Sequence, residues 1–281
     1  MTVFRPFLKW AGGKRQLLPE LVERVERLGR FRAYHEPFVG GGALFFALRT
    51  RGLIDDGVYL SDVNARLIEA YQGVATHVDE VIGLLRAHAD RHSTEHYYAT
   101  RTDDPATLPE RAARLIYLNR TCYNGLYREN SRGQFNVPMG RYANPTICDE
   151  PTLRAASLAL RTADLSVRPF DRVVEAARPG DLVYFDPPYV PLTTTASFTA
   201  YARDGFSMTD QARLADVFAT LADRGVHVML SNSKTDEVMG LFARFRIDTV
   251  RAARAVNSRA DRRGKVDEVV VTSFLDGGTR T

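Results

Sequence analysis

A four-residue motif, Asp186-Pro187-Pro188-Tyr189, carries the residue types needed to act on an amino group. It follows the apolar run at 182–185, which predicts a buried strand that ends at the acid. Proline has no N–H to donate, so this turn presents acceptors, namely the Asp186 carboxylate and the Pro187 carbonyl. Two acceptors can bind both N–H bonds of a planar amine and hold its nitrogen in line with an electrophile.

Tyr189 extends this interpretation. An enzyme that acts on a nucleobase takes the base out of its stack, and an aromatic face can then support it. The motif therefore favours chemistry on the exocyclic amine of a base. The alternative is a structural turn, in which a strand ends with an acid before two prolines.

Three glycines at 40–42 form a second candidate site, because glycine lets the backbone come close to a ligand. Asp62 lies after Gly42 at the end of a predicted strand, where a carboxylate can accept hydrogen bonds from both hydroxyls of a ribose. Its alternative role is to cap the helix that begins near Asn64. Phosphate-binding motifs fit less well. A dinucleotide fingerprint would need a third glycine at Phe45, and a P-loop ending at Lys14 would need its first glycine at Leu8.

Apolar periodicity places these motifs in an α/β fold, since a strand, a glycine turn and a helix open a nucleotide-binding unit. Strands are predicted at 33–35, 58–60, 182–185, 226–231, 246–250 and 269–274, and helices at 17–25, 43–48, 64–74 and 210–222. Between 64 and 149 the chain is helical without a convincing strand and then polar, so we predict an inserted module.

His88, His92 and His96 are spaced at intervals that would align them on one face of a predicted helix. Such a face could bind a metal, but no cysteine or carboxylate with ligand spacing completes a site. We therefore expect a polar helix surface and no metal.

The composition is that of a globular protein: of 281 residues, 44% are hydrophobic and 26% are charged. No apolar run reaches the roughly 18–20 residues of a membrane span, and charge and proline precede any apolar stretch at the start. We expect a cytoplasmic protein without a signal peptide. Cys122 and Cys148 are too few for a disulfide framework and lack zinc-ligand spacing, so both are expected as reduced thiols.

Positive charge is concentrated in two windows. Residues 111–142 contain six arginines and one acid, Glu129, and residues 251–265 contain six basic residues and one acid, Asp261. The summed positive charge of these two windows is larger than the net charge of the whole chain, +4. Basic windows on an otherwise acidic chain favour a polyanionic partner over two solvated faces.

Seven motifs, in this order, resemble those of the Dam DNA adenine-N6 methyltransferases, and the likeness runs from residue 5 to about residue 275. They are Phe7-Leu8-Lys9-Trp10-Ala11-Gly12-Gly13-Lys14, Glu36-Pro37-Phe38-Val39-Gly40-Gly41-Gly42, Tyr117-Leu118-Asn119-Arg120, Tyr123-Asn124-Gly125-Leu126-Tyr127-Arg128, Phe135-Asn136-Val137-Pro138-Met139-Gly140-Arg141-Tyr142, Asp186-Pro187-Pro188-Tyr189 and Lys265-Val266-Asp267-Glu268. The ordered set is specific, whereas Asp-Pro-Pro-Tyr alone also occurs in methyltransferases that act on cytosine N4 and other amines.

This resemblance implies S-adenosylmethionine as methyl donor and a Rossmann-like α/β sheet with an inserted helical target-recognition domain. On that basis, residues 1–64 and 150–281 would form the catalytic domain and residues 65–149 the recognition domain. The implied partner is double-stranded DNA, and we expect a monomer without an obligate protein partner.

The resemblance also implies site residues, position by position. The catalytic set is Asp186, Pro187, Pro188 and Tyr189. The cofactor-binding set is Trp10, Lys14, Phe38, Gly40, Gly42, Asp62, Phe170, Asp171 and Asp186. The DNA-binding set is Lys9, Arg120, Asn124, Leu126, Arg128, Asn130, Arg132, Asn136, Pro138, Arg141 and Tyr142.

Within the DNA-binding set, Lys9, Leu126, Arg128, Pro138 and Tyr142 match positions that the family uses to read GATC. The residue types agree, because guanine offers two major-groove acceptors to a guanidinium such as Arg128. Tyr127, Glu129 and Met139 depart from the residues expected in the family, which bears on flanking-sequence preference.

The sequence thus predicts a methyltransferase that modifies adenine N6 in duplex DNA, at GATC, by base flipping and direct displacement. The alternatives are a cytosine-N4 methyltransferase, a DNA-binding regulator without turnover, and a dinucleotide oxidoreductase, which the missing third glycine disfavours. Housekeeping marking, restriction–modification and a phage-borne role would all use the same chain.

Overall fold

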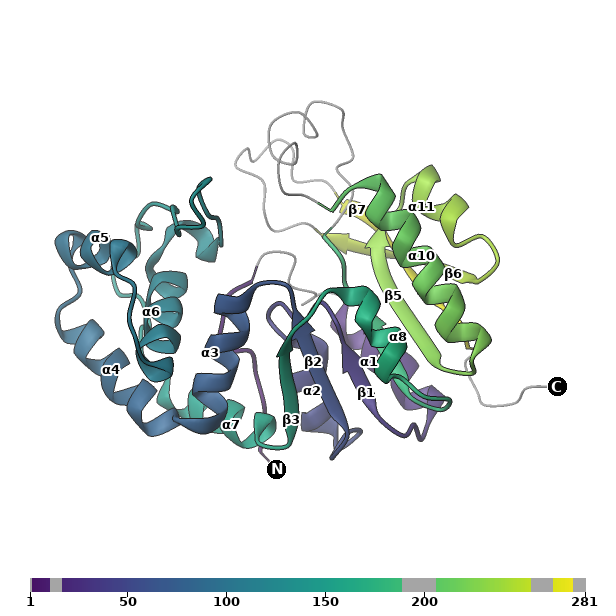
Figure 1. Cartoon of the computed structure of the whole chain (residues 1–281), viewed down its shortest axis with the longest axis horizontal. Coiled ribbons are helices and arrows are strands. Elements are labelled where there is room, and N and C mark those ends of the chain that lie inside the picture. The colour runs from purple at the N-terminus through teal and green to yellow at the C-terminus, as the bar shows by residue number, and fades with distance from the viewer. Residues whose placement is uncertain (1, 11–16, 189–205, 254–264, 275–281) are drawn as a thin grey trace. The chain divides into compact units, whose positions relative to one another are not determined.

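The computed structural model describes residues 2–10, 17–188, 206–253 and 265–274 (Figure 1). The chain forms two compact units, each assembled from separate stretches of sequence. The first unit contains residues 1–13, 39–56 and 61–167, and the second contains residues 14–38, 57–60 and 168–281. Each unit therefore depends on contacts between residues that are far apart in the chain.

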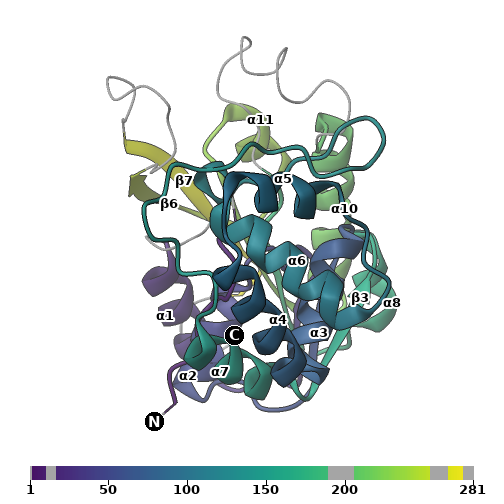
Figure 2. The same ribbon diagram turned by 90° about the vertical axis from the view of Figure 1, so that its left-hand side faces the viewer.

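The first unit is mainly helical. Its elements are α2 (Ala43–Arg51), α3 (Ala65–Thr76), α4 (Val78–Asp90), α5 (Thr94–Thr102), α6 (Leu108–Thr121), the 3-10 turn η1 (Tyr123–Gly125), α7 (Glu150–Leu160) and the strand β3 (Ala163–Val167). Helix α6 packs against α3, α4 and α5, and Figure 2 shows α4, α5 and α6 side by side. Residues 150–167, which the sequence placed with the catalytic domain, join this unit because α7 packs on α3 and α4.

Polar caps set the starts of these helices. Asn64 accepts a hydrogen bond from the Leu67 N–H at the start of α3, and Ser93 accepts one from the His96 N–H at the start of α5. The cap at Ser93 also corrects an expectation. The three histidines do not share one helix, because α4 carries His88, α5 carries His96, and His92 lies between the two helices.

The second unit holds most of the sheet. Its elements are α1 (Leu18–Leu28), β1 (Tyr34–Glu36), η2 (Phe170–Arg172), α8 (Val173–Ala176), β4 (Leu182–Phe185), α10 (Met208–Asp223), β5 (His227–Ser233), α11 (Asp236–Leu241), β6 (Arg246–Ala253) and β7 (Lys265–Thr272), together with residues 58–60 of β2 (Val58–Asp62). The strand order is β3-β2-β1-β4-β5-β7-β6. Strand β1 is parallel to β2 and β4, and β4 is parallel to β5, whereas β7 is antiparallel to both of its neighbours.

This topology confirms the predicted Rossmann-like α/β class. The strand order reverses between β1 and β4, and the carboxyl ends of these parallel strands lie at one edge of the sheet. Open α/β sheets bind their ligands outside the carboxyl ends of the strands at such a reversal. Asp186 follows β4 at this edge, as the sequence predicted.

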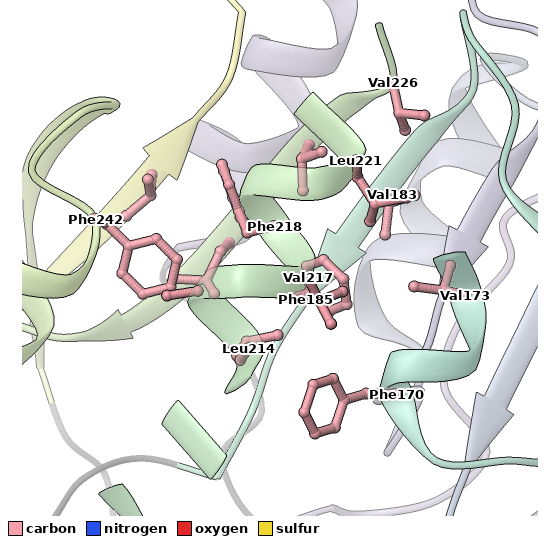
Figure 3. Close-up of a cluster of buried hydrophobic side chains, with 14 of the residues drawn as sticks. Phe170, Val173, Val183, Phe185, Leu214, Val217, Phe218, Leu221, Val226 and Phe242 are labelled. Carbon is pink, nitrogen blue, oxygen red and sulfur yellow. The ribbon is translucent and has the colours of Figure 1, made fainter. Parts of the chain in front are cut away.

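The core of the second unit forms where α10 covers the central strands. Leu214, Phe218 and Leu221 of α10 pack with Val183 and Phe185 of β4 (Figure 3). All four residues of β4 are buried, as expected for a parallel strand covered on both faces. Packing against α10 in the core therefore fixes the position of the carboxyl end of β4.

Two glycines inside helices provide a matched test of packing in the first unit. A Cβ added to Gly73 of α3 would lie 2.5 Å from the Ala112 Cβ of α6, whereas a Cβ on Gly83 of α4 meets no described atom within 4 Å. We expect Gly73→Ala to lower the free energy of unfolding by about 1–3 kcal/mol, because it overpacks the contact between α3 and α6. Gly83→Ala should raise it by about 0.5–1 kcal/mol, because alanine favours a helix over glycine. Denaturant titration measures both, and equal effects would contradict the packing argument.

Candidate active site

Asp186 is half-buried after β4, and a buried hydrogen-bond chain leads to it from β5. The Ser231 hydroxyl donates to Asp186 Oδ1 at 3.0 Å, and Ser231 Oγ lies 2.8 Å from the Tyr184 hydroxyl. Burial raises the pKa of Tyr184 well above its ordinary value, and the charge of Asp186 adds to the rise. Tyr184 therefore stays protonated and donates to Ser231, which in turn donates to the carboxylate.

Gln211 holds the proline turn that follows Asp186. Its Nε2 donates to the Pro188 carbonyl at 3.4 Å, and its Oε1 accepts from Asn232 Nδ2 at 3.0 Å. Pro187 is buried and Pro188 is exposed. No sequence motif marks Ser231, Gln211 or Asn232, although the capping box at the start of α10 places Gln211 in its first turn. The predicted Tyr189 lies outside the described residues.

Aromatic rings gather after β1. Phe38 stacks on Phe170 with ring centroids 5.3 Å apart, and Phe206 contacts both rings edge-on at 5.5 Å. Asp171 follows Phe170 and has one buried oxygen, Oδ1, that accepts no hydrogen bond from a described residue. A buried acceptor of this kind indicates a place for an outside donor. The second unit thus brings together three of the predicted cofactor residues, Phe38, Phe170 and Asp171.

Asp62 and the glycine loop, residues 39–42, are tied together in the first unit. Gly40 N donates to Asp62 Oδ2 at 3.3 Å, and Asn64 N donates to Asp62 Oδ1 at 3.0 Å. Asp62 is not the cap of α3, because Asn64 has that role. Burial raises the pKa of Asp62, and the hydrogen bonds from the backbone oppose that rise.

The loop needs glycine at both Gly40 and Gly42. Their φ angles are +47° and +64°, a region that side chains rarely adopt. A Cβ on Gly40 would lie 2.9 Å from Trp10 Cδ1, and one on Gly42 would lie 2.8 Å from the Tyr71 hydroxyl. Trp10 therefore borders the loop, and the role of both in cofactor binding stays a prediction. Lys14 lies outside the described residues.

Residues 122–142, hereafter the arm, form a hairpin-like extension after α6. Asn136 N donates to the Arg128 carbonyl at 3.0 Å, and Tyr123 N donates to the Pro138 carbonyl at 2.9 Å. Most of the predicted DNA-binding residues lie on this arm. Its exposed members are Asn124, Arg128, Asn130, Arg132, Pro138, Arg141 and Tyr142, while Leu126 and Asn136 are half-buried.

Local hydrogen bonds orient the polar residues of the arm. Arg128 Nε donates to Asn136 Oδ1 at 2.6 Å, and Asn130 Oδ1 accepts from the N–H groups of Arg132 and Gln134. Asn136 therefore fixes the guanidinium of Arg128 while most of its five donors still point elsewhere. Asn130 shapes the tip of the arm.

The basic window at 111–142 is less exposed than its charge suggested. Arg111 pairs with Glu69, Arg114 is buried with bonds to two backbone carbonyls of α5, and Arg120 donates to the Phe7 carbonyl at 2.9 Å. Burial lowers the pKa of Arg114 and Arg120. We correct the expectation for this window: half of its arginines hold the fold together. Residues 254–264 of the second window lie outside the described residues.

Asn119 joins the start of the chain to the arm. It is buried, and its side chain binds both the N–H and the carbonyl of Lys9, at 2.8 and 2.6 Å, as well as the Gly125 carbonyl at 3.2 Å. The Lys9 ammonium lies 4.6 Å from the centre of the Tyr142 ring, within the range of a cation–π contact. Lys9 is thus brought to the arm despite its distance in sequence.

The structure also places the histidines and cysteines that the sequence singled out. Among the described residues, no three histidines, cysteines or acids are placed to hold a metal ion. His88 Nδ1 lies 2.9 Å from His96 Nε2, and His92 bonds the Tyr117 hydroxyl, so these side chains pair with their neighbours. Both cysteines are free thiols, as predicted. Across the described ranges, no helix is both long and apolar enough to cross a membrane.

The role of Asn119 can be tested by unfolding. Asn119→Ala leaves the Lys9 N–H and two carbonyls without their partner, so the free energy of unfolding should fall by roughly 2–4 kcal/mol. Asn130→Ala removes an amide from the exposed tip of the arm and should change it by less than about 1 kcal/mol. Denaturant titration compares the two, and similar losses would contradict the anchoring role of Asn119.

Comparison with known proteins assigns this chain to a family. The pattern of the family described as D12 class N6 adenine-specific DNA methyltransferase matches residues 10–256. The type II methyltransferase M1.LlaDCHI of Lactococcus lactis is 41% identical over 96% of this chain and 95% of its own length. M.MjaIII of Methanocaldococcus jannaschii is 41% identical, covering 92% and 95%. The DNA adenine methylase of Escherichia coli K12 is 35% identical, covering 95% and 94%. The chain therefore belongs to the D12 class of N6 adenine-specific DNA methyltransferases.

Proposed function

We propose that this methyltransferase uses S-adenosylmethionine to methylate adenine N6 within GATC in duplex DNA, after the adenine has been flipped out of the helix. The observation that carries this proposal is the Asp186 carboxylate, which is held by Ser231 beside a proline turn held by Gln211. Family membership supports adenine as the substrate over cytosine N4 and excludes the dinucleotide oxidoreductase.

Asp186 and the proline turn would bind the amine of the flipped adenine. The lone pair of an exocyclic amine is delocalised into the ring, so acceptors on both N–H bonds favour a tetrahedral nitrogen that can attack. Asp186 also keeps the ammonium-like charge that develops on the nitrogen close to a carboxylate. Rigid support matters, because a small misplacement of reacting groups costs orders of magnitude in rate.

S-adenosylmethionine, which supplies an electrophilic methyl group, is the cofactor that the family implies, and each unit carries residues of a type that could bind a part of it. Asp62 would accept hydrogen bonds from the ribose hydroxyls, since a carboxylate has about four lone-pair sites and its backbone donors Gly40, Val63 and Asn64 do not fill them. Phe38 and Phe170 offer aromatic faces to the adenine ring, and the unpaired Asp171 Oδ1 would accept from its amine. Trp10, Gly40 and Gly42 would line the methionine part, and Lys14 belongs to this set from the sequence alone.

Residues 65–149 would recognise the target. Arg128 is exposed on the arm and oriented by Asn136, as a bidentate contact with guanine requires. Lys9, Leu126, Pro138 and Tyr142 complete the proposed reading set. Asn124, Asn130, Arg132, Asn136 and Arg141 would support contacts to the backbone. Arg120 fits this role less well, because it is committed to the Phe7 carbonyl.

Expression in a host that lacks DNA methylation tests the proposal. Sequencing of methylated sites should find adenine methylation at GATC with the wild type and none with Asp186→Ala. The DNA affinity of Asp186→Ala should stay within about tenfold of wild type, because phosphate contacts supply most of that affinity. Wild-type methylation by Asp186→Ala would refute the catalytic assignment, and a silent wild type that still binds DNA would favour the regulator.

A matched pair of arginines separates base reading from phosphate binding. Arg128→Ala should lose about 1–3 kcal/mol of discrimination at one guanine. Arg132→Ala should weaken binding to every duplex and reduce the slope of log affinity against log salt by about 0.9 per lost phosphate contact. Affinities for GATC and altered duplexes across a salt series measure both, and identical behaviour of the two variants would contradict this division.

A further inference from the structure

Tyr127 lies between the two halves of the proposed activity. Its ring stacks on Trp10, with centroids 5.3 Å apart and planes inclined by 28°. Trp10 borders the glycine loop, and Arg128, the proposed guanine reader, follows Tyr127 directly in the arm. One aromatic contact therefore joins the segment that would hold the cofactor to the segment that would read DNA.

The hydroxyl of Tyr127 is fixed by polar partners. This hydroxyl donates to the Glu129 carboxylate, which lies 3.7 Å from Arg66 Nε of α3. The Asn64 side chain is also hydrogen-bonded to the Tyr127 hydroxyl. Burial raises the pKa of Tyr127 above its ordinary value, and the bond to Glu129 adds to that rise. Tyr127 is thus a neutral donor whose ring cannot move away from Trp10 without breaking polar contacts.

These contacts complete a closed ring of neighbouring residues within the first unit. Asn64 and Gly40 donate backbone N–H groups to the two oxygens of Asp62. Gly40 borders Trp10, Trp10 stacks on Tyr127, and Tyr127 returns to Asn64. A shift of Trp10 or of the glycine loop is therefore transmitted to the residue beside Arg128.

We propose that Tyr127 is a positioning residue that makes cofactor binding and DNA reading cooperative. This inference rests on the proposed function, because it takes the ligands on either side of Tyr127 from there. A cofactor packed beside Trp10 restricts the stacked ring and so preorganises the arm, and DNA held by the arm restricts Trp10. Each ligand then lowers the entropy cost of binding the other. Tyr127 and Glu129 are also two of the residues that the sequence marked as departures from the family motifs.

The test measures coupling instead of activity. S-adenosylhomocysteine is titrated into the full-length protein by calorimetry, without and with a saturating GATC duplex. In the wild type we expect the duplex to lower the Kd of S-adenosylhomocysteine by roughly fivefold or more, the lower bound of typical coupling between two sites. The reciprocal titration must give the same factor. Emission from Trp10, the single tryptophan of the chain, reports the same event at the stacked ring.

Two substitutions at Tyr127 separate the ring from its hydroxyl. Tyr127→Leu removes the stacked ring, so the coupling factor should fall to near one while the Kd of each ligand alone changes much less. Tyr127→Phe keeps the ring and loses its polar contacts, so its factor should lie between those of Tyr127→Leu and the wild type. Thermal unfolding confirms that both variants fold, and the Phe variant still reports on the inference if the Leu variant does not.

The matched control is Tyr98→Leu, which changes an exposed tyrosine of α5 that contacts Tyr97 and Arg101. It should keep the wild-type coupling factor. A wild-type factor in Tyr127→Leu, a factor in Tyr127→Phe as low as in Tyr127→Leu, or independent binding in the wild type would each overturn the inference. A wild type that binds neither S-adenosylhomocysteine nor the duplex would instead refute the proposed function.

Discussion

The Asp62 carboxylate is the constraint on which the first unit depends. Its two oxygens bind the N–H of Gly40 and the N–H of Asn64, which belong to different turns of the chain. This carboxylate therefore ties the glycine loop to the start of α3, and the Tyr71 hydroxyl of α3 adds a bond to the Gly40 carbonyl at 3.0 Å. Burial raises the pKa of Asp62, and the backbone donors oppose that rise.

In the second unit, neutral side chains hold the residues of the candidate site in place. Asp186 is supported by Ser231 from β5, and the proline turn is supported by Gln211 from α10. Both supports are buried, so they do not compete with water for the groups they hold. The Asp186 carboxylate and the proline turn are thus held in place by buried neighbours.

The sequence predicted those helices and strands that are marked by residue patterns within a short stretch of chain. Strand β4 was predicted with its observed bounds, because a continuous apolar run ends at an acid and two prolines. Strand β3 was missed although Ala163, Leu165 and Val167 alternate with polar residues, because this edge strand is short and none of its residues is buried. The regular spacing of the three histidines suggested one helix, but a new helix, α5, begins after Ser93. Only the capping hydrogen bond of Ser93 shows this break.

The candidate site was predictable where residue type alone limits its chemistry, as for Asp62 and Asp186. Contacts between distant residues left no trace in the sequence. Nothing in the spacing of Trp10 and Tyr127 indicates that their rings stack, and nothing in the charge of Arg114 shows that it binds backbone carbonyls in the interior. Charge counts give the number of arginines and not the direction in which they point.

The position of β7 has a consequence for the order in which the chain can fold during its synthesis. Strand β7 is the last strand in the sequence, yet it lies between β5 and β6 and pairs with both. Strand β6 reaches the rest of the sheet through β7, so it has no partner until residues 265–272 have left the ribosome. The helical first unit ends at residue 167 and can form earlier. The nascent chain therefore has a folded arm before it has a complete sheet.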